Sequence, residues 1–324
     1  MLNRRTWLAA LVAATLVTPA LAQDAAPTAK MPVVATFSIL GDFVRQVGGD
    51  RVSVSTLVGP NGDAHVFQPA PADAKKIAAA KVVFVNGLGF EGWIDRLVKS
   101  SGTKAKIFVA SKGVEPREMA EEEEEAGHDA HAKDAHAKDA HAHEAHDHGG
   151  TDPHAWQSVA NAKLYVANIR DGLIATDPDG KAAYEANAAA YTAKLDALET
   201  EVKAAIAKIP ADKRRIITSH DAFGYFSAAY GIEFVAPQGV STEAEASAKD
   251  VAKIIRQIKA EKIPAVFMEN ISDPRLVKRI ASETGAKIGG EVYSDALSDD
   301  KGPASTYIDM IENNIHQFSA ALSS

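Results

Sequence analysis

Short runs rich in β-branched residues alternate with longer segments of helical periodicity along most of this chain. The pattern begins with a β-rich run at 33–37, a helical segment at 39–47 and a second β-rich run at 51–58, and it resumes after position 210. Further along the chain, helices are predicted at 155–175 and 246–261. Because parallel strands need crossover connections, this alternation indicates parallel sheets covered by helices. We therefore predict an α/β fold with mainly parallel sheets flanked by helices.

One helix of unusual length is predicted in the middle of the chain. Apolar residues recur there at helical spacing, after the punctuating sequence Pro178-Asp179-Gly180: Tyr184, Tyr191, Leu195, Leu198, Val202 and Ile206. At about 1.5 Å per residue the helix would be about 45 Å long, enough to run along two lobes and join them. We predict an N-terminal lobe at 23–178, a linking helix at 179–209 and a C-terminal lobe at 210–324.

An acidic, histidine-rich tract interrupts the N-terminal lobe at about 119–150. Five consecutive glutamates are followed by irregular repeats of Ala, Asp, Lys and His, and nothing in them can bury an apolar face. The tract is therefore predicted to be disordered. One interpretation is a solvated loop without a further role, but its imidazole content favours weak metal binding at many positions. The histidines are His128, His131, His136, His141, His143, His146 and His148.

The N-terminus has the three parts of a secretory signal peptide. Arg4 and Arg5 precede an apolar stretch at 7–17, and the small-residue sequence Ala20-Leu21-Ala22 follows. The apolar stretch is shorter than the roughly 20 residues that a membrane helix needs. We predict a cleaved signal peptide at 1–22, with a membrane anchor or a twin-arginine export signal as the alternatives.

The composition limits which metal-ligand atoms the chain can offer and which partners it can bind. The chain has no cysteine, a formal net charge of −8 and no basic stripe. The missing thiols exclude disulfides, thiolate metal sites and a lipidated N-terminal cysteine, and the acidic balance argues against a nucleic-acid partner. We expect an unanchored, monomeric periplasmic protein that binds any metal through nitrogen and oxygen.

Three potential metal ligands follow predicted strands, namely His65, His220 and Asp295, and a fourth, His154, follows the acidic tract. Ligands of α/β sheets bind outside the carboxyl ends of the strands, so these residues could converge in a cleft between the lobes. Three imidazoles and one carboxylate form a tetrahedral set suited to zinc. Each residue alone could equally cap a turn or sit in the core. His316, the one other histidine outside the tract, is predicted to lie on a solvated helix face.

Four segments of the chain resemble the periplasmic metal-binding receptors of zinc and manganese ABC transporters, the cluster A-I substrate-binding proteins. They are "GPNGDAHVFQPAPADAKKIAAAKVVFVNGLGFEGW", "TDPHAWQSVANAKLYVANI", "RRIITSHDAFGYFSAAYGI" and "YSDALSDDKGPASTYIDMIENNI". The resemblance implies that His65, His154, His220 and Asp295 bind the metal and that the long helix makes the hinge between the lobes rigid. It also implies a partner permease in the inner membrane. Many zinc receptors of this family carry a cysteine pair in the second lobe, which this chain lacks.

Zinc is the predicted cargo, and no organic cofactor is expected. In this chain, a histidine occupies the position of the third metal ligand of the receptors that it resembles. Imidazole favours zinc, although copper and nickel would also fit such a site, whereas carboxylate suits manganese. Glu269 is the one nearby acid that could replace Asp295 or orient a histidine. Because the histidines must be neutral to coordinate, affinity should fall steeply below about pH 6.

Three other functions are compatible with the same residues. The first is a manganese or iron receptor of the same family. The second is a secreted zinc hydrolase, which is disfavoured by the absence of an H-E-x-x-H element and by a fourth protein ligand that would close the site. The third is a zinc buffer or an adhesin. The preferred prediction is a non-enzymatic receptor that delivers Zn(II) to an ABC permease and that a periplasmic zinc chaperone could supply.

Overall fold

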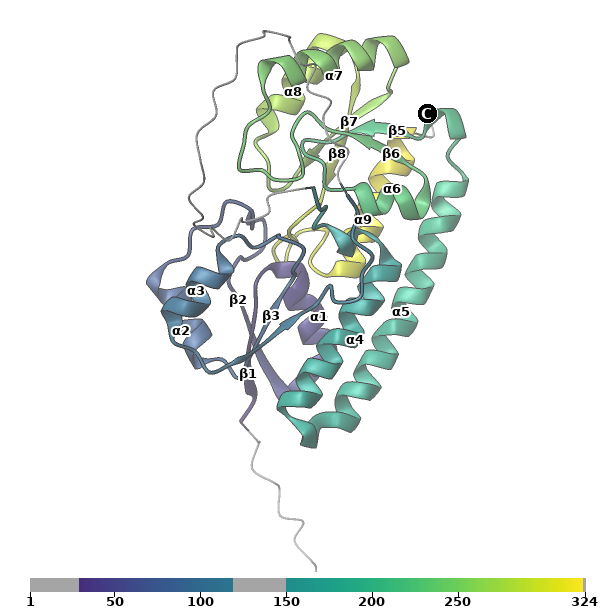
Figure 1. The fold of residues 1–324 in the computed structure, drawn as a ribbon. Coiled ribbons are helices and arrows are strands. Elements are labelled where there is room, and N and C mark those ends of the chain that lie inside the picture. Colours follow the sequence, from purple (N-terminus) through teal and green to yellow (C-terminus); the bar gives the residue numbers. More distant parts are fainter. Residues whose placement is uncertain (1–28, 119–149, 323–324) are drawn as a thin grey trace, which may run out of the picture.

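A computed structural model describes residues 29–118 and 150–322 of the chain (Figure 1). The expected signal peptide at 1–22 and the seven histidines of the acidic tract lie outside the described residues. Within the described part, no helix combines the length and the apolar character that crossing a bilayer requires.

The N-terminal lobe is built on a four-stranded parallel sheet in the order β2-β1-β3-β4. The strands are β1 (Met31–Ala35), β2 (Val52–Thr56), β3 (Val82–Val85) and β4 (Lys106–Val109). The helices between them are α1 (Ser38–Gly48), α2 (Pro71–Ala79) and α3 (Ile94–Ser101). Strand β3 is buried along its whole length, as its uninterrupted apolar sequence predicts for a strand covered on both faces.

The C-terminal lobe repeats this arrangement with a parallel sheet in the order β6-β5-β7-β8. The strands are β5 (Arg215–Ile217), β6 (Glu233–Val235), β7 (Ala265–Glu269) and β8 (Lys287–Val292). The helices are α6 (Gly224–Tyr230), α7 (Ala248–Glu261), α8 (Pro274–Thr284) and α9 (Tyr307–Leu322). In both sheets the first strand in sequence is internal, so the next strand is added on one side of it and the later strands on the other. Ligands of α/β proteins bind at the carboxyl ends of the strands where the order switches sides in this way.

The longer of two neighbouring helices connects the lobes. Helix α4 spans Val159–Thr176, and α5 spans Lys181–Ala207, which corresponds to about 40 Å. Figure 1 shows α5 running along the side of the molecule from one lobe to the other, and it packs on α1, α4, α6 and α9. The predicted fold class, two lobes with mainly parallel sheets flanked by helices and joined by one long helix, is therefore confirmed.

The two lobes share one hydrophobic core. Buried residues of α1, α4 and α5 form a single continuous cluster with buried residues of β7, α6 and α9. Phe43 of α1 illustrates the connection, because its ring packs 4.7 Å from that of Tyr307 in α9. A separate, smaller cluster lies between the C-terminal sheet and the helices α7 and α8. A core shared across the junction resists a wide opening of the lobes.

Side-chain caps set the starts of two helices a few residues later than the sequence pattern predicts. The segment predicted as one helix from Ala155 begins as a single 3-10 turn, and α4 begins only after Ser158, whose hydroxyl accepts the backbone N–H of Asn161. Likewise α7 begins after Ser247, which forms a capping box with Asp250. A serine that caps a helix adopts an extended backbone, which ends any preceding helical turn.

Candidate metal centre

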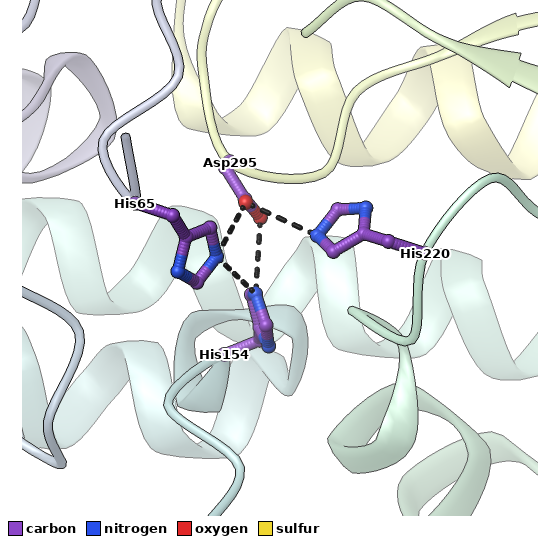
Figure 2. A group of neighbouring side chains, drawn as sticks. All are labelled: His65, His154, His220 and Asp295. Carbon is purple, nitrogen blue, oxygen red and sulfur yellow. Dashed lines mark hydrogen bonds and ion pairs between the residues drawn. The ribbon is translucent and has the colours of Figure 1, made fainter. Parts of the chain in front are cut away.

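Four side chains from four separate segments meet between the lobes (Figure 2). His65 lies in the loop between β2 and α2, and His154 directly precedes the 3-10 turn Ala155–Gln157. His220 and Asp295 each follow the end of a C-terminal strand by three residues, β5 and β8 respectively. One potential ligand atom from each residue lies within 4.8 Å of all the others. The structure thus brings together the four residues that the sequence singled out.

The three imidazoles direct their Nε2 atoms toward the carboxylate of Asp295 (Figure 2). Nε2 of His65 and Nε2 of His220 each lie 3.2 Å from Oδ2, and Nε2 of His154 lies 3.4 Å from Oδ1. The Nε2 atoms of His65 and His154 are 3.3 Å apart. Zinc bonds of about 2.0–2.1 Å place neighbouring ligands of a tetrahedron about 3.3–3.4 Å apart. These four spacings are close to those between neighbouring ligands of a tetrahedral zinc ion, and all four potential ligand atoms lie within 4.8 Å of one another.

The centre is almost completely shielded from solvent. His154, His220 and Asp295 are fully buried, and His65 is only 8% exposed. The ring of His65 packs edge-on against Phe90, with centroids 4.8 Å apart. Such burial is costly for a polar cluster without a partner, whereas a divalent cation would satisfy all four groups. His65 is the ligand on the side from which solvent reaches the site.

Contacts behind His154 fix the orientation of its ring. Its Nδ1 lies 2.8 Å from Oδ1 of Asp152, and this carboxylate oxygen also accepts the backbone N–H of His154 at 2.9 Å. The carbonyl of Pro153, between them, accepts from the side-chain amide of Asn86 at 3.0 Å. A carboxylate on Nδ1 leaves Nε2 as the nitrogen that faces the centre and strengthens it as a ligand.

Glu269 performs the corresponding task for His220. Its Oε2 lies 2.6 Å from Nδ1 of His220, off the line of a regular hydrogen bond. Its Oε1 accepts the backbone N–H groups of Ser219 and His220 at 2.6 and 3.0 Å. Of the two roles that the sequence left open for Glu269, its position fits the orientation of a histidine, because it lies behind the ring and not at the Nε2 atoms.

Two aspartates next to the ligands were not singled out from the sequence. Asp63 and Asp152 each precede a ligand histidine by two residues, and each accepts the backbone N–H of that histidine at 2.9 Å. The repeated pattern D-x-H, in Asp63-Ala64-His65 and Asp152-Pro153-His154, could have identified both of them. An aspartate that accepts from the residue two positions later forms an Asx turn, which presents the following side chain in a fixed direction.

The electrostatics of the centre are governed by its buried carboxylates. Burial alone would raise the pKa of Asp295, but His154 and His220 hold it well below its ordinary value. Burial would lower the pKa of His154, yet Asp295 and Asp152 raise it to about 9. Despite burial, Glu269 and Asp295 raise the pKa of His220 well above its ordinary value. Without metal, these two imidazoles are therefore protonated at neutral pH and neutralise the surrounding carboxylates.

Zinc binding is expected to release about two protons per ion between pH 7 and 8. Both imidazoles must be neutral to coordinate, and the raised pKa values of His154 and His220 leave both protonated in this range without metal. Because protons compete with zinc for these imidazoles, the affinity for zinc should fall by about two log units for each pH unit below about pH 9. This fall begins well above pH 6, where ordinary imidazoles would become protonated. Calorimetry in buffers of different ionisation enthalpy measures the release, and a value near zero would contradict the charge assignment.

Glu269→Gln is expected to weaken zinc binding by about 10- to 100-fold. The amide keeps the size of the side chain but removes the charge that orients His220 and strengthens it as a ligand. Substitutions of residues that hydrogen-bond a metal ligand typically reduce metal affinity by this factor. Competitive titration against a chelator of known affinity measures the effect. Glu233→Gln on the exposed strand β6 is the matched control and should bind zinc like the unaltered protein.

Among the described residues, His316 is the one histidine outside this centre. His316 lies on the exposed side of α9, as predicted, and it does not belong to the buried group. In the part of the chain that the structure describes, the group of His65, His154, His220 and Asp295 is the one cluster with metal-ligand spacing. The seven tract histidines lie outside that part.

Comparisons with known proteins find relatives that are named for metal binding or metal uptake. The family described as "ZnuA: Zinc-uptake complex component A periplasmic" matches residues 33–321. The manganese-binding lipoprotein MntA of Halalkalibacterium halodurans is 32% identical over 90% of this chain and 89% of its own length. The iron-binding protein YfeA of Yersinia pestis is also 32% identical, over 88% and 84%. The structure of the periplasmic zinc binding protein TroA from Treponema pallidum has a TM-score of 0.79 at 29% identity, covering 91% of this chain and all of TroA.

Proposed function

We propose that zinc is the cargo of this chain, which belongs to the ZnuA family of periplasmic zinc-uptake components. As a member of that family, it is a metal-binding substrate-binding protein of an ABC transporter. The observation that carries the choice of zinc is the donor set of the buried centre: three imidazoles and one carboxylate, whose potential ligand atoms lie within 4.8 Å of one another. Imidazole favours zinc, whereas manganese prefers oxygen ligands.

The relatives do not decide between metals, because they are named for manganese, iron or zinc at similar identity. The decision therefore rests on His220, which supplies nitrogen as the third ligand. A manganese or iron receptor remains the competing function, and the names of MntA and YfeA agree with it. A zinc hydrolase is less compatible with the centre, because four protein ligands would occupy all four positions of tetrahedral zinc and leave none for water.

The proposal places the protein outside the cytoplasm as a receptor for an inner-membrane ABC permease. The signal-peptide pattern at 1–22 and the extracytoplasmic relatives support this location. The histidine-rich tract ends directly before His154, so zinc bound there would be held at a high effective concentration beside the main centre. We extend the proposal to a role of the tract in capturing zinc.

Metal-dependent uptake by cells tests the choice of zinc better than affinity alone. Any site with nitrogen and oxygen ligands binds zinc more tightly than manganese, so an affinity ratio does not identify the cargo. Deleting the gene is expected to abolish uptake of radioactive zinc from zinc-depleted medium and to leave manganese uptake unchanged. Loss of manganese uptake with normal zinc uptake would overturn the proposal in favour of the competing one.

A variant that lacks residues 121–149 tests the role of the tract. In zinc titrations with metal analysis, it should lose weak sites and keep one tight site. In cells it should import zinc more slowly at limiting zinc concentrations and normally at high ones. Unchanged import at every zinc concentration would remove the tract from the proposal without affecting the main centre.

A further inference from the structure

The loop that carries His65 is hydrogen-bonded to the opposite lobe at two points. The backbone N–H of Asn61 donates to the carbonyl of Leu297, two residues beyond Asp295, at 2.8 Å. Two residues further along the loop, the carboxylate of Asp63 accepts the hydroxyl of Thr242 at 2.6 Å. The side chain of Asn61 also accepts the side-chain amide of Asn270 at 3.0 Å, so three hydrogen bonds join the N-terminal lobe to the C-terminal lobe beside the metal centre.

Asp63 uses its two oxygens for two different purposes. Oδ1 accepts the backbone N–H of His65, and Oδ2 accepts the hydroxyl of Thr242. The carboxylate therefore connects the position of the ligand His65 directly to a side chain of the other lobe. Hydrogen bonds to a charged group are stronger than neutral ones, so this connection has a measurable effect.

The segment that carries Thr242 is also attached to a second metal ligand. This segment, 238–246, lies within the connection between β6 and α7. Its first residue, Gln238, pairs with His220 as an isolated parallel bridge, and its carbonyl accepts the backbone N–H of Asp221 at 3.1 Å. The segment thus reaches from His220 in its own lobe to the loop of His65 in the opposite lobe.

A solvent-filled cleft of about 460 Å³ borders this contact. Asp63, Thr242, Ser219 and Gln238 are among the residues that line it, together with residues of α8. Thr242 and Asp63 are both half-buried, in contrast to the fully buried core that joins the lobes elsewhere. The segment can therefore move without disturbing core packing, and the hydrogen bond is accessible to competing water.

We propose that the Thr242–Asp63 hydrogen bond is a latch between the lobes that holds His65 on the metal and sets the rate of metal release. The proposal rests on the proposed metal-receptor function and extends it to the control of dissociation. Asp63 is a positioning residue in this scheme, because it acts through His65. Breaking the latch frees the loop at one of its two attachment points, so His65 leaves the metal more easily while the ligand set stays complete.

Metal dissociation from the zinc-loaded, full-length mature protein tests the latch. The protein is mixed with excess chromogenic chelator in a stopped-flow instrument, at chelator concentrations where the rate no longer depends on the chelator. Thr242→Val, which removes the hydroxyl and keeps the shape, is expected to release zinc about tenfold faster, the typical effect of losing a hydrogen bond to a charged group. Its association rate should change less than twofold. Thr242→Ser should restore slow release.

Matched variants separate the latch from general destabilisation. Thr200→Val removes an exposed hydroxyl on α5, which donates to the carbonyl of Asp196, and should release zinc at the original rate. In an Asp63→Ala background, Thr242→Val should have no further effect, because its partner is gone. An unchanged release rate in Thr242→Val alone, or a full tenfold effect in the Asp63→Ala background, would overturn the latch.

The failure of the underlying function would look different. Loss of manganese uptake with normal zinc uptake in cells would contradict zinc as the cargo, and the same series would then be measured with manganese. Faster manganese release from Thr242→Val, with recovery in Thr242→Ser, would still support the latch.

Discussion

His220→Ala is expected to lower zinc affinity by about 100-fold or more. Four-ligand zinc sites bind with roughly 10–16 kcal/mol, so one ligand contributes about 3 kcal/mol on average, and each 1.4 kcal/mol corresponds to a factor of ten. The variant also leaves Glu269 without the imidazole that compensates its buried charge. Isothermal or competitive titration measures the loss, and Asp295→Ala should produce a loss of similar size from the other side of the centre.

The control for His220→Ala is His316→Ala. It removes an imidazole from the exposed side of α9 and should leave the affinity of the tight site unchanged. Circular dichroism of each variant establishes that the fold persists, so that a loss of binding reports the site alone. Tight zinc binding that persists in both His220→Ala and Asp295→Ala would refute the assignment of the centre and leave the fold unaffected.

The convergence of the four ligands could be predicted from the sequence because it follows from topology. His220 and Asp295 each stand just beyond a β-rich run, and parallel strands place their carboxyl ends on one edge of a sheet. Strand and helix types were predictable for the same reason, since local periodicity determines them. The helix starts after Ser158 and Ser247 differ from the prediction, because a single capping hydroxyl outweighs the apolar pattern there.

Contacts between distant segments could not be predicted in this way. Glu269 was recognised in the sequence as an acid near the site, but which of its two roles it takes depends on the separation of β5 and β7, which no local pattern encodes. The Thr242–Asp63 contact depends on how the two lobes approach each other, across 179 positions of sequence. The D-x-H pattern before His65 and His154 is an exception, because an Asx turn is local and is visible in the sequence.

The shared core has a consequence for stability as well as for motion. Phe43 lies in the N-terminal lobe, and its ring contacts those of Tyr165 in α4, Tyr191 in α5 and Tyr307 in α9. Helix α9 packs in turn on β8 of the C-terminal lobe. One fully buried side chain therefore contacts helices of both lobes and the long helix α5 that joins them.

Phe43→Ala is accordingly expected to lower the free energy of unfolding by about 3–5 kcal/mol, the usual cost of removing a buried aromatic ring. Because the core is common to both lobes, they should still unfold in one transition, shifted to lower denaturant concentration. Urea unfolding followed by fluorescence and by circular dichroism measures both quantities. Leu164→Ala, an apolar truncation at an exposed position of α4, should cost less than about 1 kcal/mol. Two separate transitions, with only one of them shifted, would show that the lobes unfold independently and that the helices between them act as a linker without a common core.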